Sequence, residues 1–175
     1  IGYALGLFFL VPLADLVENK RLMLLTLLVS FLSLIATALA DSPSIMLILC
    51  LTVGMSSVSV QVLIPLAAHL SSDAKRGQVL GNIMAGLLLG ILLARPISSL
   101  IADHFGWRAV FYFAAGCMVF IAAVIYFAIP IRQPSHKTNY FALLKSLKQL
   151  IVSQAVLRQR AFYQALMFAS FSLFW

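Results

Sequence analysis

The sequence has few charged residues and correspondingly little material for chemistry that depends on charge. Only 10% of its 175 residues are charged, compared with about 25% in soluble proteins. Apolar residues make up 63%, whereas soluble proteins have about 45–50%. A soluble domain of this composition would expose large apolar surfaces, which favour aggregation. The composition therefore excludes an ordinary soluble fold and indicates a membrane protein.

Signals of enzymes, metal sites and nucleic-acid binding are also absent from the sequence. No HExxH, GxSxG or P-loop pattern occurs. Cys50 and Cys117 lie inside apolar stretches without CxxC spacing, which is typical of core residues. The net charge of +7 comes from basic residues between apolar blocks, a pattern that fixes the orientation of a membrane protein. We therefore predict no enzymatic activity, no cofactor, no metal ion and no nucleic-acid partner.

A start methionine and a basic region ahead of the first apolar run are missing as well. The chain begins inside an apolar run at Ile1 and stops inside another at Trp175. A secretory signal needs a basic region before its apolar part. We therefore expect a piece of a longer chain.

Long apolar runs are what the sequence does contain. A helix needs about 20 apolar residues to cross the hydrocarbon core of a bilayer. Four runs reach or approach this length, and a shorter run stands at each end of the chain. The complete runs are Leu22–Ala40, Ile45–Leu70, Val79–Ala102 and Ala109–Ile131, and the partial ones are Ile1–Ala14 and Ala161–Trp175.

The basic residues between these runs predict an orientation in the membrane. The five successive connections contain 2, 0, 2, 1 and 6 Lys and Arg residues. High and low counts alternate, as they do when basic loops stay in the cytoplasm. We predict that the first, third and fifth connections are cytoplasmic.

These signals together predict an all-α, polytopic helical bundle with three regions. Residues 1–131 form a transmembrane bundle, 132–160 a cytoplasmic linker, and 161–175 the start of a further span. Within the linker, apolar residues at Tyr140, Leu144, Leu147 and Ile151 recur at helical spacing. This pattern fits either an amphipathic helix on the inner membrane surface or a soluble linker helix.

Asp15 is the first candidate functional residue. It closes the first apolar segment, so its carboxylate opposes the dipole at a helix C-terminus and needs a compensating group. Lys20 and Arg21 are near in sequence, and Arg76 lies on the same predicted side of the membrane. Asp15 is either an ordinary interfacial charge or a latch that favours one conformation.

Small residues predict where helices approach each other closely. Gly2 and Gly6 form one GxxxG pattern, and Gly86 and Gly90 form another. A further small-residue patch lies within the run Ile45–Leu70, at Gly54, Ser56, Ser57 and Ser59.

Arg95, Pro96 and Gln61 are polar or helix-breaking residues inside the predicted spans. Arg95 either faces a water-filled cavity or extends outward to the membrane surface. Pro96 removes the backbone hydrogen bond to Leu92 and so favours a kink. Gln61 either contacts substrate or donates a hydrogen bond to a neighbouring helix.

Two stretches, VPLADLVENKR and LLARPISSLIADHFGWR, carry a resemblance to a known family, the major facilitator superfamily, and specifically to its bacterial drug-efflux members. The first stretch is similar to that family's loop between helices two and three, with matches at Leu13, Ala14, Asp15, Lys20 and Arg21. LLARPISSLIADHFGWR is similar to the helix-five signature, in which Pro96 matches and Arg95 replaces a glycine. Cys50 stands where the family has an arginine in helix four.

The resemblance implies a partial major facilitator fold that runs from within helix two to the start of helix seven. It implies that Asp15 takes part in the gate between the two halves, and that the protein is a multi-pass carrier of the bacterial inner membrane. No complete span has an acidic residue in its middle. If protons are the coupling ion, their carrier must therefore lie outside this chain.

Two functional hypotheses follow. The first is efflux of small organic molecules by alternating access, with this chain as part of the transporter and the lipid bilayer and a small-molecule substrate as its partners. The second is a non-transporting membrane scaffold, or the remnant of a disrupted transporter reading frame.

Overall fold

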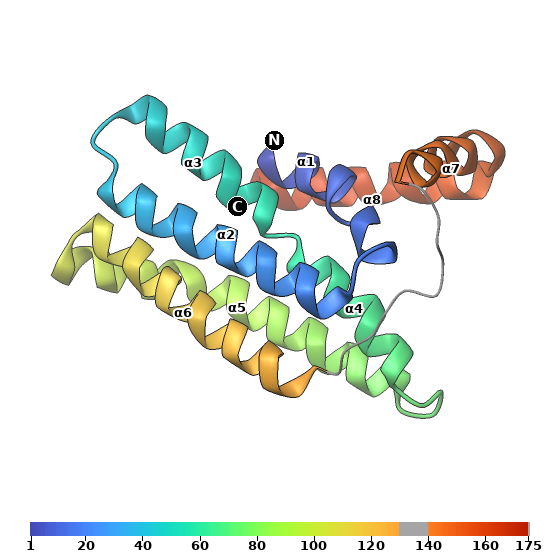
Figure 1. Ribbon diagram of the computed structural model, residues 1–175, viewed down its shortest axis with the longest axis horizontal. Coiled ribbons are helices and arrows are strands. Elements are labelled where there is room, and N and C mark those ends of the chain that lie inside the picture. Colours follow the sequence, from blue (N-terminus) through green and yellow to red (C-terminus); the bar gives the residue numbers. More distant parts are fainter. Residues whose placement is uncertain (130–139, 175) are drawn as a thin grey trace. The chain divides into compact units, whose positions relative to one another are not determined.

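The computed structural model describes residues 1–129 and 140–174. Within this range it leaves out the side chains of Asp15, Val60, His69, Phe141, Leu144, Leu147, Lys148, Phe171 and Phe174. The regular elements of the described residues are all helices (Figure 1). They form two compact units, Ile1–His136 and Lys137–Trp175, which we describe separately. The all-α class predicted from the sequence is confirmed.

The described part of the first unit contains six α-helices and one short 3-10 helix. The 3-10 helix is η1 (Pro12–Asp15), and it follows directly on the first α-helix. The α-helices are α1 (Gly2–Phe9), α2 (Asn19–Leu39), α3 (Pro43–Ser56), α4 (Ser59–Leu70), α5 (Arg76–Phe105) and α6 (Trp107–Ala128).

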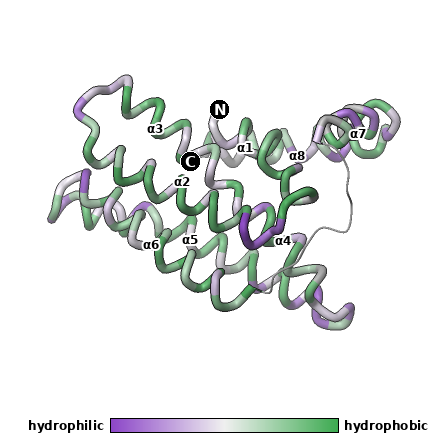
Figure 2. Tube along the Cα trace, in the orientation of Figure 1, coloured by the Kyte–Doolittle hydropathy of each residue, from purple (hydrophilic) through white to green (hydrophobic). Residues whose placement is uncertain are grey.

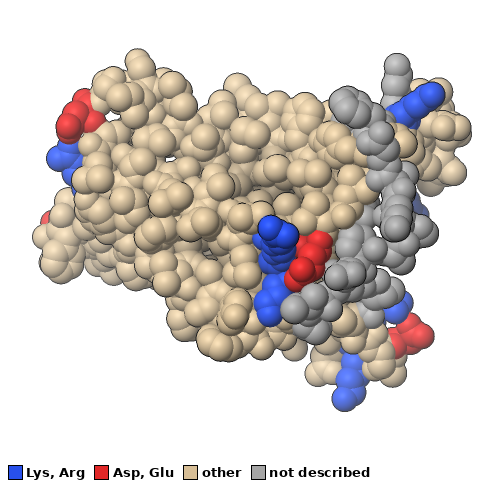
Figure 3. Space-filling model, in the orientation of Figure 1, with Lys and Arg blue, Asp and Glu red and all other residues tan. Residues whose placement is uncertain are grey.

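Four segments of the described residues are long and apolar enough to cross a membrane. They are Asn19–Leu39, Pro43–Ala68, Arg76–Phe105 and Trp107–Ala128, and they correspond to the four complete runs predicted from the sequence. Hydrophobic residues extend along these helices, and hydrophilic residues gather at the connecting loops (Figure 2). On the face shown in Figure 3, charged side chains form a few small groups with uncharged surface between them.

Several helix boundaries differ from the predicted runs, and α2 for example begins at Asn19 rather than at Leu22. The run Ile1–Ala14 is not one helix, because α1 ends at Phe9 and Asp15 ends the separate helix η1. The run Ile45–Leu70 is divided between α3 and α4. The run Val79–Ala102 is extended at both ends by polar residues, so that α5 spans Arg76–Phe105. Apolar composition marks the part of a helix inside the membrane, whereas backbone hydrogen bonds continue past it.

Helix α2 lies at the centre of the first unit and packs against α6 and α3. Its buried residues recur along the whole helix, from Leu22 to Ala38. The apolar core joins α2, α4 and α6 and consists of Leu22, Met23, Leu27, Val62, Leu66 and Ile125. Helix α5 packs against α4 and α6 at the edge of the unit, and none of its described residues is buried.

Glycines allow α1 and α3 to approach closely, as the Gly2–Gly6 pattern predicts. A Cβ atom on Gly6 would meet the carbonyl oxygen of Met55 and would lie 2.8 Å from Cγ1 of Val58. From the other side, a Cβ atom on Gly54 would lie 3.1 Å from the backbone nitrogen of Tyr3. Without glycine at these positions the two backbones would have to separate.

The second unit contains α7 (Tyr140–Ser153) and α8 (Ala155–Phe174), which contact each other. Helix α7 covers the described part of the predicted amphipathic segment. Helix α8 begins at Ala155, earlier than the predicted start of the last span at Ala161. The rest of the predicted linker, residues 132–139, lies outside the described residues.

Candidate functional site

The most unusual feature inside the predicted membrane region is the break between α3 and α4. Helix α3 ends at Ser56, and Ser57 and Val58 form a turn before α4 begins at Ser59. The hydroxyl of Ser57 donates to the carbonyl oxygen of Val53 at 2.6 Å. Serine side chains that bond to their own backbone in this way compete with the helical hydrogen bonds and bend helices. The cluster of serines explains why the helix stops here.

Pro65 adds a second interruption inside α4. Proline has no backbone N–H, so the carbonyl group of Gln61 loses its helical donor. Interrupted helices are tolerated within a bilayer only where other groups satisfy the freed backbone atoms. The segment from Ser56 to Pro65 therefore contains two interruptions, the turn at Ser57 and Val58 and the proline inside α4.

Two hydroxyl pairs connect this break to α2. Ser30 donates to Ser56 across a distance of 2.7 Å between the two hydroxyl oxygens, and both residues are buried. Thr26 and Ser59 share a second hydrogen bond of 2.7 Å. The two pairs hold the end of α3 and the start of α4 against the same face of α2, one on each side of the break.

The serines of the break were predicted as a small-residue patch, whereas their partners on α2 were not predicted. Thr26, Ser30, Ser33 and Thr37 are all buried and follow one another at spacings of three or four residues. That spacing places them on one face of a helix, and it was the signal available in the sequence. The buried side-chain polar atoms of the described residues all have hydrogen-bond partners.

A cavity of about 220 Å³ lies beside the break. Its walls come from α2, α3, α4 and α6 and from the turn between α3 and α4. The cavity is lined by Met23, Leu27, Ser30, Ser56, Ser57, Ser59, Leu63, Met118, Ile121 and Ile125. This lining is apolar with several hydroxyl groups and carries no charge, so it suits neutral contacts. Among the described residues no group of His, Cys, Asp or Glu could hold a metal ion.

Asp15, Lys20 and Arg21 were predicted to share one loop, but Lys20 and Arg21 lie in the first turn of α2. Asp15 is the last residue of η1, and its side chain lies outside the described set. The ammonium group of Lys20 lies 4.9 Å from the centre of the Tyr126 ring on α6, which is within the range of a cation–π contact. Arg21 is exposed. The predicted pairing of Asp15 with a basic group stays a prediction.

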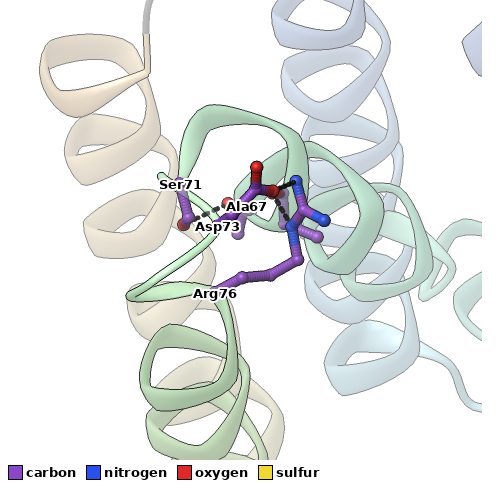
Figure 4. Close-up of polar contacts among 5 residues, drawn as sticks. Ala67, Ser71, Asp73 and Arg76 are labelled. Carbon is purple, nitrogen blue, oxygen red and sulfur yellow. Dashed lines mark hydrogen bonds and ion pairs between the residues drawn. The ribbon is translucent and has the colours of Figure 1, made fainter.

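Arg76, the first residue of α5, has partners in the α4–α5 loop and in α4 (Figure 4). Its guanidinium group forms an ion pair with Asp73 at 2.8 Å and donates from Nε to the carbonyl oxygen of Ala68 at 3.0 Å. The hydroxyl of Ser71 donates to the carbonyl oxygen of Ala67 at 2.6 Å. These bonds satisfy the last carbonyl groups of α4 and hold the start of α5 against its end.

Gln61 bonds to a neighbouring helix, which was one of its two predicted roles. Its side-chain nitrogen Nε2 donates to the phenolic oxygen of Tyr3 on α1 at 2.9 Å. Both residues lie where α1 crosses the α3–α4 region. The contact joins the two interrupted segments of the first unit.

The predicted helix-five residues all lie on α5. Arg95 and Pro96 are exposed, and the helix continues through Pro96 to Phe105 without a break. A Cβ atom on Gly86 or Gly90 would meet no atom of the described structure within 4 Å. Close packing at this second GxxxG pattern is therefore absent among the described residues, in contrast to the first pattern.

An ion pair joins the α2–α3 loop to the start of α6. Arg108 Nη2 lies 2.8 Å from Asp41 Oδ1, and the guanidinium carbon of Arg108 lies 5.1 Å from the ring centre of Trp107. Gly106 has a φ of 83°, a conformation that favours glycine and permits the tight corner between α5 and α6.

Comparison with known proteins agrees with this helical architecture. The sequence profile of the Major Facilitator Superfamily matches residues 1–175. Over 175 residues the chain is 42% identical to the uncharacterized transporter YgaY of Escherichia coli O157:H7. It is 29% identical over 175 residues to SCO4007 of Streptomyces coelicolor, which is also named as a transporter. All of this chain is covered in both comparisons, and it spans 44% and 41% of those two proteins. No solved structure matches the chain.

Proposed function

The chain belongs to the major facilitator superfamily and is an integral membrane protein, and from that premise we propose that it is part of a secondary transporter. The transporter carries a small organic molecule across the membrane by alternating access. The observation that carries this proposal is the family match over residues 1–175, together with relatives named as transporters.

In this proposal the described helices form most of one bundle, which rocks against a second bundle around a central site. Residues 1–131 are the bundle, residues 132–160 the cytoplasmic linker and residues 161–175 the start of the next span. The open surface of α5, which has no buried residue among those described, is consistent with a helix that completes its packing against lipid or further protein.

The direction of transport in this proposal is outward, across a bacterial inner membrane. The resemblance of the loop at Asp15 and of the α5 segment around Pro96 to drug-efflux members supports export. Asp15 with Lys20 and Arg21 contributes to the cytoplasmic gate, and Arg95 faces the route of the substrate. No acidic residue lies in the middle of a span, so this chain contributes no carboxylate that would carry protons through the membrane.

The test uses a complete protein that contains this chain. Expressed in a susceptible bacterial strain, it should lower the accumulation of one or more compounds from a panel of small organic molecules. A test variant carries Arg95→Leu, which we expect to reduce export at unchanged expression, and unaltered export would contradict a place for Arg95 on the substrate route. If the complete protein changes the accumulation of no compound in either direction, the scaffold or remnant hypothesis is favoured instead.

A second measurement separates the chain from the whole transporter. The chain by itself, reconstituted in lipid vesicles, should show no substrate flux, because one bundle leaves the central site open on one side. Robust flux through vesicles that contain only this chain would contradict the proposed division into two bundles.

A further inference from the structure

The second unit differs from the first in its charge. Residues 137–175 contain the basic residues Lys137, Lys145, Lys148, Arg158 and Arg160 and no aspartate or glutamate. In the first unit, by contrast, Arg76 and Arg108 each have a carboxylate partner. The positive charge of the second unit therefore has no side-chain counter-charge within the unit.

Helix α7 presents apolar side chains that its own unit leaves about half exposed. Leu150 and Ile151 are 46% and 53% exposed, although both belong to the apolar series that begins at Tyr140. Lys145 and Gln149 are also exposed and lie on the opposite side of the helix, as the helical repeat requires. One face of α7 is therefore apolar, and the opposite side carries Lys145 and Gln149 beside the exposed Val152.

The connection between the two helices fixes α7 close to the start of α8. Gln154 is the single residue between them. Its backbone N–H donates to the carbonyl oxygen of Leu150 at 3.0 Å, and Arg158 of α8 donates from Nη1 to the carbonyl oxygen of Val152 at 2.9 Å. The guanidinium group thus caps the C-terminal end of α7 and ties it to the first turn of α8.

This connection also sets the depth of α7 relative to a membrane. After Arg160 the chain carries no charged residue up to Trp175, and Phe162 and Met167 are 62% and 70% exposed. If this part of α8 enters the hydrocarbon layer, Arg158 and Arg160 lie at the level of the lipid headgroups. Helix α7, which turns away from the axis of α8 (Figure 1), then lies at the same level.

A solvated linker helix fits these features less well. Helices that stay in water usually carry charges of both signs, paired three or four residues apart. Helix α7 has no acidic residue with which to form such pairs, and its apolar face would be exposed to water.

We propose that α7 lies in the headgroup layer of the membrane and binds anionic phospholipids. Its apolar face contacts the upper part of the acyl chains, and its lysines contact the lipid phosphates. Such binding combines buried apolar area with attraction to negative lipid. The surface is independent of the transported substrate, so it extends the proposed function without depending on it.

The first test measures the depth of α7 in nanodiscs that contain the full 175-residue chain. In a background with Cys50→Ala and Cys117→Ala, a fluorophore is attached to Ile151→Cys or to Gln149→Cys. With phosphatidylglycerol present, quenchers attached to the lipid tails should act on the label at residue 151, and an aqueous quencher on the label at residue 149. Equal aqueous quenching at both positions would show a solvated linker helix and overturn the proposal.

The second test measures the recognition of negative lipid. In detergent, phosphatidylglycerol is titrated onto the chain and its binding is followed by native mass spectrometry, with phosphatidylcholine as the neutral comparison. Lys145→Gln should weaken phosphatidylglycerol binding roughly fivefold, as expected for one basic residue near an anionic surface, and high salt should have the same effect. Lys145 is exposed, so its replacement leaves the packing intact.

The matched control for this charge is Lys75→Gln. Lys75 is also exposed and lies in the loop before α5, so the substitution removes the same charge from a loop predicted to lie on the same side. It should leave the affinity for phosphatidylglycerol nearly unchanged. Equal weakening by both substitutions would show that binding depends on the net charge of the chain and would overturn a specific role for α7. Equal binding of phosphatidylglycerol and phosphatidylcholine would also overturn the proposal.

Discussion

At the scale of single residues, the glycines of the two GxxxG patterns have different surroundings. Gly6 faces the backbone of α3, and an added Cβ would meet Met55 and Val58. Gly86 and Gly90 have no described atom within 4 Å of an added Cβ. The same sequence pattern thus marks a close helix contact in one place and an open helix surface in the other.

This difference predicts opposite effects of alanine at the two patterns. Gly6→Ala should destabilise the chain by about 1–3 kcal/mol, because the new methyl group forces α1 and α3 apart. Gly86→Ala should be neutral or stabilise it by up to about 1 kcal/mol, since alanine favours the helix and nothing obstructs it. Thermal unfolding in detergent, followed by circular dichroism, measures both. Equal destabilisation by the two substitutions would contradict the packing described for α1.

The hydroxyl pair of Ser30 and Ser56 gives a second prediction at this scale. In a double-mutant cycle with Ser30→Ala and Ser56→Ala, the coupling energy should be about 0.6 kcal/mol, as is typical of hydrogen bonds between membrane helices. The control cycle combines Ser30→Ala with Ser71→Ala, because the Ser71 hydroxyl bonds to Ala67 at the end of its own helix and not to Ser30. If the control cycle gives an equally large coupling energy, the hydrogen bond between Ser30 and Ser56 is not the source of the coupling energy measured for that pair.

At the scale of elements, the interrupted segment α3–α4 is the part of the first unit most suited to bending. Its two halves are held to α2 by separate hydroxyl pairs, through Ser56 and Ser59. A cavity lies beside the turn between them. A span whose two halves have separate contacts can change its bend without losing either contact.

Replacement of Pro65 tests the importance of this bend. Pro65→Ala supplies the N–H that the Gln61 carbonyl lacks, so α4 should straighten and the helix should gain up to about 3 kcal/mol. The change in bend is measured as the distance between spin labels on α3 and α4. If the bend serves transport, the complete protein should also transport more slowly.

Pro43→Ala is the control for this substitution. Pro43 is at the start of α3, where the first N–H of a helix has no helical partner in any case. We therefore expect little change in stability, spin-label distance or transport. An unchanged spin-label distance in Pro65→Ala would contradict a role for Pro65 in the bend between α3 and α4.

At the scale of the whole molecule, the proposed gate is a property of the complete transporter. In the complete protein, Asp15→Asn should shift the balance between inward- and outward-facing states. The substitution removes the negative charge through which Asp15 makes the proposed gate contacts. Accessibility of introduced cysteines on the two sides of the membrane measures this balance. Glu18→Gln is the control, since it removes an equal charge from the same loop.

Identical labelling of the natural protein and Asp15→Asn would leave Asp15 as an ordinary interfacial charge. An equal shift with Glu18→Gln would assign the effect to the charge of the loop as a whole. Either result would contradict a specific role for Asp15 in the gate.

The helical class and the number of spans could be predicted from the sequence. Runs such as Leu22–Ala40 are long enough to cross a bilayer by themselves, and backbone hydrogen bonds within lipid must close inside each helix. The helix at Tyr140 also followed from local spacing. Boundaries were less accurate, because the helix α5 continues through polar residues beyond its apolar run.

The candidate site was predictable only in part. The serines at the break and Gln61 stood out as polar residues in apolar surroundings. The pairing of Ser56 with Ser30, and of Gln61 with Tyr3, depends on which helix lies beside which. These partners are far apart in the chain, so no local pattern could identify them.

The sequence by itself therefore determined that this protein is a helical membrane protein, because span length and loop charge act locally on each segment. Only the tertiary structure decided where the span at Ile45–Leu70 is interrupted, which glycines are packed, and which hydroxyl groups meet. In a bilayer no hydrophobic driving force selects one helix neighbour over another, so contacts depend on the shape and hydrogen bonding of both surfaces together. Which residues contact each other therefore depends on two helices at once and is decided only when the helices pack together.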